Sequence, residues 1–206
     1  MNFPNTEKIK FSKNIIIIDG DYIDHVAFNL TVNFERMLNR KIPKADFSQW
    51  IVNIALDGRM KQGNNQTQVV ILHDKKTNTI ENFRPSDLSK ELNEHAFKDN
   101  YLGEFIISTI PIDNKLTNKE NIIIDLLHTI INHKEVERIM IIPNSEQGSI
   151  YSSLRKELNY ADEEKHVTIF AMQPMEGGNF KQEILGYSIM HAMGITSDEI
   201  NNKITT

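Results

Sequence analysis

Two short polar segments carry the residue types that could do chemistry. Asp19 and Asp21 are separated by one glycine, and Asn144 and Glu146 are separated by one serine. Carboxylate and amide oxygens are the ligands that hard cations such as Mg²⁺ and Mn²⁺ prefer. A cation held by such oxygens can acidify and orient a water molecule and stabilise charge on a phosphoryl group. If the two segments meet in space, they predict metal-dependent hydrolysis of a phosphate ester.

The elements that precede these segments are predicted strands, which would bring the segments together. Asp19 follows the run Ile15–Ile18, and four consecutive β-branched residues indicate a strand buried on both faces, as in a parallel sheet. Asn144 follows a predicted strand over 137–142. Open α/β sheets bind ligands at the carboxyl ends of their strands. The competing interpretation is that the acids around Gly20 only form a turn and a helix cap.

The rest of the chain alternates between predicted strands and helices. We predict strands over 14–18, 68–72, 105–110, 137–142 and 166–171, and helices over 24–40, 46–57, 86–96, 117–133, 149–158 and 181–193, with a short last helix from Ser197. This alternation predicts an α/β three-layer sandwich, in which a mostly parallel five-stranded sheet has helices on both faces. We expect the strand order 3-2-1-4-5, which places the ends of strands one and four at the switch point.

The same pattern predicts a single α/β domain over residues 1–206. Its core covers about 14–172, and a helical extension covers about 177–203. Apolar residues that gather in this extension are expected to lie mostly in the core and partly in an exposed patch that would bind a second copy of the chain as a homodimer. They are Phe170, Met172, Met175, Phe180, Tyr187, Met190 and Met193.

Composition excludes several classes of protein. The 206 residues include 23 basic and 28 acidic ones, for a net charge of −5, and no cysteine. The lack of cysteine excludes a disulfide framework and thiolate sites. The sequence contains no run of basic residues of the kind that indicates nucleic-acid binding, although a small local groove could still bind RNA. Segment 1–13 lacks the apolar stretch of a signal peptide and no apolar run has the length of a membrane span, so we expect a cytoplasmic protein that does not bind membranes.

The order of these motifs resembles the NYN branch of the PIN-like nuclease superfamily. The first strand of that family ends in a pattern like Asp-Gly-Asp-Asn, and residues 19–22 read Asp-Gly-Asp-Tyr. The fourth strand of the family ends in Ser-Gly-Asp-x-Asp, where this chain has Asn144 in place of the first Asp and Glu146 in place of the second. The family also has an acid on the helix before that strand. Here Asp125 is the only acid within the apolar body of the predicted helix, and Glu120 lies at its cap.

The resemblance implies a PIN/NYN-like fold with extra helices and a Mg²⁺- or Mn²⁺-dependent RNA hydrolase. It implies Asp19, Asp125, Asn144 and Glu146 as catalytic residues, and Asp19, Asp21 and Glu146 as ligands of the cation. Asn144 removes one negative charge from this site. An alternative is a non-catalytic binding or scaffolding protein of the same fold. It is favoured by Asn144, by the acidic net charge of the chain and by the absence of basic patches in the sequence. A third interpretation is a flavodoxin-like or phosphatase-like domain with Asp19 as nucleophile.

Overall fold

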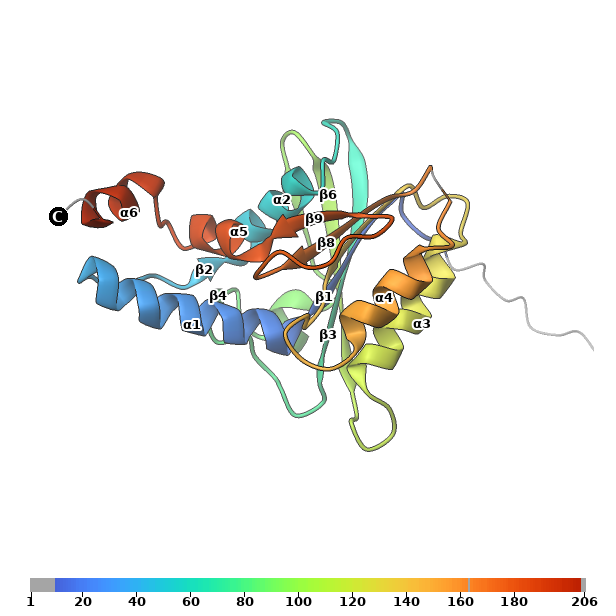
Figure 1. The fold of residues 1–206 in the computed structure, drawn as a ribbon, viewed down its shortest axis with the longest axis horizontal. Coiled ribbons are helices and arrows are strands. Elements are labelled where there is room, and N and C mark those ends of the chain that lie inside the picture. Colours follow the sequence, from blue (N-terminus) through green and yellow to red (C-terminus); the bar gives the residue numbers. More distant parts are fainter. Residues whose placement is uncertain (1–9, 163, 205–206) are drawn as a thin grey trace, which may run out of the picture.

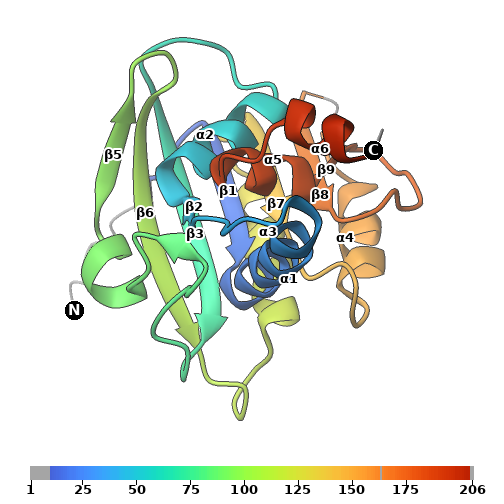
Figure 2. The ribbon, with the colours of Figure 1, turned by 90° about the vertical axis from the view of Figure 1, so that its left-hand side faces the viewer.

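A mixed sheet of seven strands forms the centre of the computed structural model, which describes residues 10–162 and 164–204. The strands are β1 (Asn14–Asp19), β3 (Asn65–Asp74), β5 (Ala96–Asp99), β6 (Gly103–Ile112), β7 (Arg138–Ile142), β8 (His166–Ala171) and β9 (Lys181–Ile184). Figure 1 shows the sheet between its helices, and Figure 2 labels the strands in their order, β5-β6-β3-β1-β7-β8-β9. Only the β5–β6 pair is antiparallel. A second, two-stranded sheet pairs β2 (Ala45–Asp46) with β4 (Phe83–Arg84).

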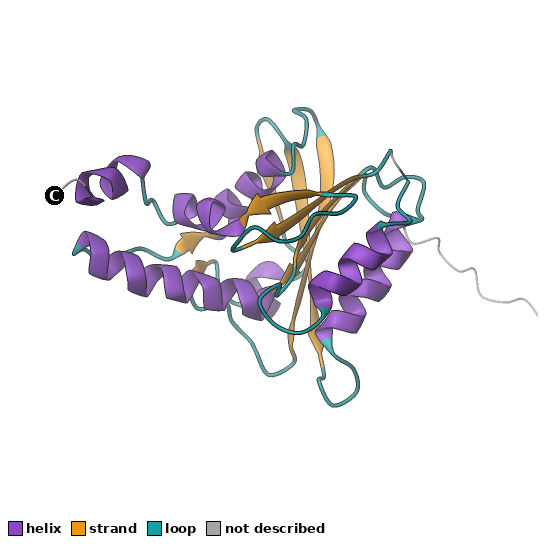
Figure 3. Ribbon diagram, in the orientation of Figure 1, coloured by secondary structure: helices purple, strands orange, loops and turns teal. Residues whose placement is uncertain are grey.

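Helices cover both faces of the large sheet (Figure 3). On one face lie α1 (Gly20–Leu38), α2 (Phe47–Asp57) and α5 (Leu185–Ala192), which Figure 2 shows in front of the sheet. On the other face lie α3 (Lys119–Ile131) and α4 (Ile150–Leu158). A last helix, α6 (Ser197–Ile204), contacts α1. None of the helices in the described part of the chain is long and apolar enough to cross a membrane.

The isoleucine run of β1 connects the two apolar cores. Successive side chains of a strand point to opposite faces of its sheet. Ile16 and Ile18 therefore pack with α1, α2 and α5, whereas Ile15 and Ile17 pack with α3 and α4. All four are at most 1% exposed, and full burial of one such side chain is worth about 1.5–3 kcal/mol. The continuous apolar run is required because β1 has no solvent-facing side.

The predicted α/β class is confirmed, and the five predicted strands correspond to β1, β3, β6, β7 and β8. They lie in the order β6-β3-β1-β7-β8, which is the predicted order 3-2-1-4-5. The prediction of a five-stranded sheet was wrong, because β5 and β9 extend the sheet at its two edges.

Strand β9 lies where a helix was predicted, and β5 begins at the last residue of another predicted helix. The predicted helix over 86–96 forms only one π-helical turn (Leu88–Leu92), and Glu94 with a φ of 60° follows it before β5 begins. The segment Lys181–Ile184 was predicted to start a helix, but it pairs with β8 as β9, and α5 begins only after it. Pairing with an existing sheet edge overrides weak local preference in both cases. The expected helical extension over 177–203 therefore begins with a strand.

The apolar residues near the C-terminus divide between core and surface. Phe170 and Met193 are fully buried, whereas Tyr187 is 70% exposed. Trp50 of α2 donates a hydrogen bond to the Ser188 hydroxyl of α5 at 3.1 Å, which fixes α5 against α2. The homodimer expected from this region stays a prediction.

Candidate functional site

Asp19 is both the last residue of β1 and the cap of α1. Its Oδ1 accepts a hydrogen bond from the Tyr22 backbone N–H at 3.1 Å, and the residue is only 4% exposed. No loop separates strand from helix, so α1 begins at Gly20 rather than at the predicted residue 24. This direct transition requires a glycine at position 20, because a Cβ there would lie only 2.9 Å from Cγ2 of Ile71 in the neighbouring strand β3. Asp19 therefore does cap α1, and it does so with a carboxylate at the carboxyl edge of the sheet.

Lys119 lies between the two carboxylates that follow β1. Its Nζ is 2.6 Å from Oδ1 of Asp19 and 2.5 Å from Oδ2 of Asp21. The Lys119 side chain is only 18% exposed, and it comes from the first residue of α3, which starts at the same edge of the sheet. The three side chains form an ion-paired group that we call the Lys119 triad.

Asp21 is held by further donors from the segment that follows β3. Its Oδ2 also accepts from the Asp74 backbone N–H at 2.8 Å, and its Oδ1 accepts from the Thr77 hydroxyl at 2.6 Å. Both carboxylate oxygens are thus occupied by donors from two separate elements. The orientation of Asp21 is fixed by these contacts, so it is not a freely available ligand.

Burial and ion pairing act in opposite directions on the Lys119 triad. Burial raises the pKa of Asp19, an effect that the Lys119 ammonium offsets only in part. Burial acts in the same direction on Asp21, but hydrogen bonds from Lys119 and Thr77 outweigh it and lower the pKa of that carboxyl. Burial would lower the pKa of Lys119, but the two carboxylates outweigh it and raise that pKa. Lys119 therefore stays protonated at neutral pH.

A hollow of about 460 Å³ opens beside the Lys119 triad. It is lined by Asp21, Tyr22, His25, Asn29, Lys119, Asn144, Glu146 and Gln147, and we call it the carboxyl-edge pocket. Three buried polar atoms at or next to it make no hydrogen bond of good geometry with a described residue: the Tyr22 hydroxyl, Asn144 Oδ1 and the Ser145 hydroxyl. The Tyr22 hydroxyl nevertheless lies close to the side chains of Ser145 and Glu146. A buried polar group without a partner costs about 1–3 kcal/mol. These atoms are therefore suited to a partner that enters the pocket.

Tyr22 is one of the residues that line this pocket. The residue is 4% exposed, its ring is packed in the core, and its buried hydroxyl lies beside Ser145 and Glu146. Burial, together with the negative charge of Glu146, raises the pKa of Tyr22. The hydroxyl keeps its proton and can donate it to an acceptor.

One family matches this chain. A family of unknown function, DUF6621, matches residues 8–200. The chain belongs to this family. Comparison with curated proteins finds no match, and comparison with solved structures finds none either. The function of this DUF6621 chain is therefore argued from its site.

The structure of the DUF6621 chain brings four of the five predicted site residues to one edge. Asp21, Asn144 and Glu146 line the carboxyl-edge pocket, and Asp19 joins them through Lys119. Asp125 is not among the residues that line it, and it is exposed six residues further along α3. The reason is that α3 begins at Lys119, so its first residue, and not one of its second turn, reaches the carboxylates.

Sequence reasoning missed Lys119, although one local signal marks it. A cation in the first turn of a helix is unfavourable because the positive end of the helix dipole lies there. Lys119 occupies the first position of α3, directly after the Asn118 cap. A lysine in this unfavourable place indicates that a carboxylate outside the helix compensates it.

The Lys119 triad does not fit a divalent cation as it is arranged. A cation between Asp19 and Asp21 would have to displace an ammonium group that already contacts both carboxylates. Within the residues that the structure describes, no group of three or more His, Asp or Glu side chains is arranged to hold a metal ion. The predicted Mg²⁺ or Mn²⁺ and the predicted roles of its ligands stay predictions.

Proposed function

We propose that this chain is a non-catalytic binding domain of the PIN/NYN-like type, in which Lys119 takes the place of a catalytic cation. The observation that carries this proposal is the position of Lys119 Nζ, 2.6 Å from Asp19 and 2.5 Å from Asp21. An ammonium group neutralises carboxylates as a metal ion does. It has no open coordination position at which a water molecule could be acidified, so it cannot supply the chemistry of a metal-bound nucleophile.

The ligand of the carboxyl-edge pocket is a small, polar and uncharged or cationic molecule. The volume of about 460 Å³ lies within the range of about 300–1,000 Å³ that is usual for small-molecule sites. Asn144 Oδ1 offers an acceptor, and the Tyr22 hydroxyl, which lies beside Ser145 and Glu146, offers a donor when it rotates toward the ligand. The lining contains the carboxylates of Asp21 and Glu146 against the single ammonium group of Lys119, a balance that repels phosphate groups.

A metal-dependent RNA hydrolase is the second candidate. The unpartnered oxygen of Asn144, close to the carboxylate of Glu146, is the observation that favours it, because hard cations are bound by such oxygens. This function requires Lys119 to leave both carboxylates. The two candidates therefore differ in what happens when Lys119 is replaced.

Titration with Mn²⁺ and Mg²⁺ separates the two candidates. For the non-catalytic domain, millimolar metal leaves the thermal midpoint of the wild type unchanged, and no metal-dependent cleavage of a single-stranded RNA is detected. Lys119→Met leaves two unpaired carboxylates, so this variant should be less stable and should regain stability when Mn²⁺ is added. Lys115→Ala, an exposed lysine of the preceding turn, is the matched control and should respond as the wild type does.

The proposal is overturned if Mn²⁺ stabilises the wild type, if the wild type cleaves RNA in a metal-dependent reaction, and if Asp19→Asn loses both properties. That result would establish the hydrolase instead.

A further inference from the structure

The opposite edge of the sheet carries a second hollow, of about 300 Å³, whose charged lining residues are all basic. It lies where β7, β8 and β9 begin and where α2 ends. Arg59, Arg138, Lys165 and Lys181 line it together with His166, and no acidic residue does. We call it the amino-edge pocket. Four permanent cations around one small hollow are unexpected in a chain with a net charge of −5.

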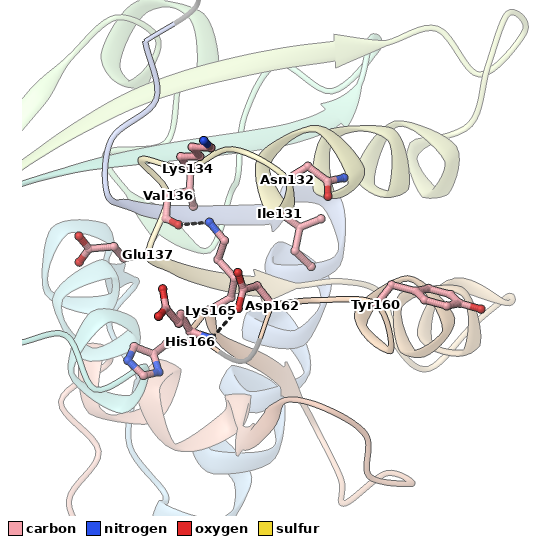
Figure 4. A pocket seen from close by; sticks show the side chains of 10 residues that line it. Ile131, Asn132, Lys134, Val136, Glu137, Tyr160, Asp162, Lys165 and His166 are labelled. Atoms are coloured by element: carbon pink, nitrogen blue, oxygen red, sulfur yellow. Dashed lines mark hydrogen bonds between the residues drawn. The ribbon is translucent and has the colours of Figure 1, made fainter.

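Two of these cations are fixed by neutral backbone groups. Arg138 Nη1 donates to the Gly58 carbonyl at 2.6 Å. Lys165 Nζ donates to the His133 carbonyl at 2.7 Å and to the Val136 carbonyl. Figure 4 shows Lys165 extended toward Val136 in the neighbouring hollow, which shares Lys165 and His166 with the amino-edge pocket. These contacts orient the two side chains without bringing a carboxylate into direct contact with them.

The four cations of the amino-edge pocket form no ion pair with a described residue. They are Arg59, Arg138, Lys165 and Lys181. Glu137 acts on Arg138, but its carboxylate is paired with Lys13 at 2.6 Å. Burial lowers the pKa of Arg138, and Glu137 offsets that only in part. A partly buried guanidinium without a carboxylate partner is costly unless an anion accompanies it.

We propose that the amino-edge pocket binds the phosphate group of a small phosphomonoester. A guanidinium group can pair with two phosphate oxygens at once, and an ammonium group adds a point charge. Arg138 lies at the start of β7 and Lys181 at the start of β9, so they approach the hollow from either side of β8. The volume suits one phosphate and a small attached group. This site is separate from the carboxyl-edge pocket and does not depend on the function proposed for it.

Calorimetric titration with inorganic phosphate and with adenosine 5′-monophosphate tests this proposal. We expect saturable binding of both by the wild type, weaker at higher salt. Loss of one charge-assisted contact should weaken binding about tenfold in Arg59→Asn and in Lys181→Gln. Arg59 has a φ of 59°, a conformation that asparagine tolerates well, and both side chains belong to exposed residues, so both variants should fold.

Lys76→Gln removes an exposed charge from a turn outside the pocket and is the matched control. The proposal is supported if this control binds phosphate as the wild type does while both pocket variants bind it more weakly. It is overturned if no saturable binding occurs, or if all three variants lose affinity equally, which would indicate general charge attraction. Much tighter binding of a single-stranded RNA through the same two residues would also overturn it, because a macromolecule would then be the ligand.

Discussion

Lys119 Nζ lies 2.6 Å from Asp19 Oδ1, although the two residues are 100 positions apart in the chain. The contact joins the first turn of α3 to the end of β1, at the edge where ligands bind to open α/β sheets. Asp19 and Asp21 are therefore the acidic half of an internal ion pair whose basic half is Lys119. This pairing affects the stability of the protein as well as the shape of the site.

Replacement of Lys119 is expected to destabilise the protein strongly. Removal of one partner of a buried ion pair typically costs about 3–5 kcal/mol, and we expect a value near the lower end because the triad borders a hollow. Urea unfolding of Lys119→Met measures the loss of unfolding free energy. In the double variant Lys119→Met with Asp21→Asn the loss should be smaller, because one unpaired charge is gone. Equal losses in the single and double variants would show that the pairing is not what stabilises this edge.

The two carboxylates of the triad should affect acid stability in opposite directions. The pKa of Asp21 is lowered, so its contribution is present above its ordinary value of 3.8 and is lost as the pH falls through the folded-state pKa. The pKa of Asp19 is raised, so its contribution is present below 3.8 and is lost as the pH rises through the folded-state pKa. Unfolding of Asp21→Asn and of Asp19→Asn, each compared with the wild type across this range, measures both. The same sign for both variants would contradict the assignment.

The hydroxyl of Tyr22 should contribute little to the stability of the ligand-free protein. It is buried close to Ser145 and Glu146 but makes no hydrogen bond of good geometry with a described residue, so Tyr22→Phe should leave the unfolding free energy unchanged or raise it by up to about 1 kcal/mol. Tyr151→Phe is the matched control. The Tyr151 hydroxyl donates to the Glu176 carbonyl at 2.6 Å, so its removal should cost about 1 kcal/mol. A larger loss in Tyr22→Phe than in Tyr151→Phe would show that the Tyr22 hydroxyl has a partner.

Both faces of β1 should be equally sensitive to loss of side-chain volume. Ile16 and Ile17 are fully buried on opposite faces of the sheet, so truncation of either to alanine should cost about 2–5 kcal/mol. Val32→Ala on α1, where the residue is 39% exposed, should cost much less. Chemical unfolding of the three variants measures this. A small loss at only one of the two isoleucines would mean that one helical layer packs loosely on the sheet.

The sequence by itself determined the centre of this protein. The run Ile15–Ile18 predicts a strand buried on both faces, because only a strand without a solvent-facing side needs apolar residues at consecutive positions. The alternation of elements then predicts the order of the five central strands and places Asp19, Asp21, Asn144 and Glu146 at one edge. Strands β5 and β9 were missed, because their pairing depends on the sheet edges next to them and only weakly on their own residues.

Only the tertiary structure decided which side chain meets the carboxylates. Asp125 and Lys119 belong to the same helix, and a shift of a few residues in its starting point would change which residue reaches the edge of the sheet. The cap at Asn118 sets that starting point, and packing of α3 against β3 and α4 sets its distance from Asp19. An ion pair forms when charges come close in space. The sequence around each residue does not specify that distance, which is why the sequence did not indicate that Lys119 contacts Asp19 and Asp21.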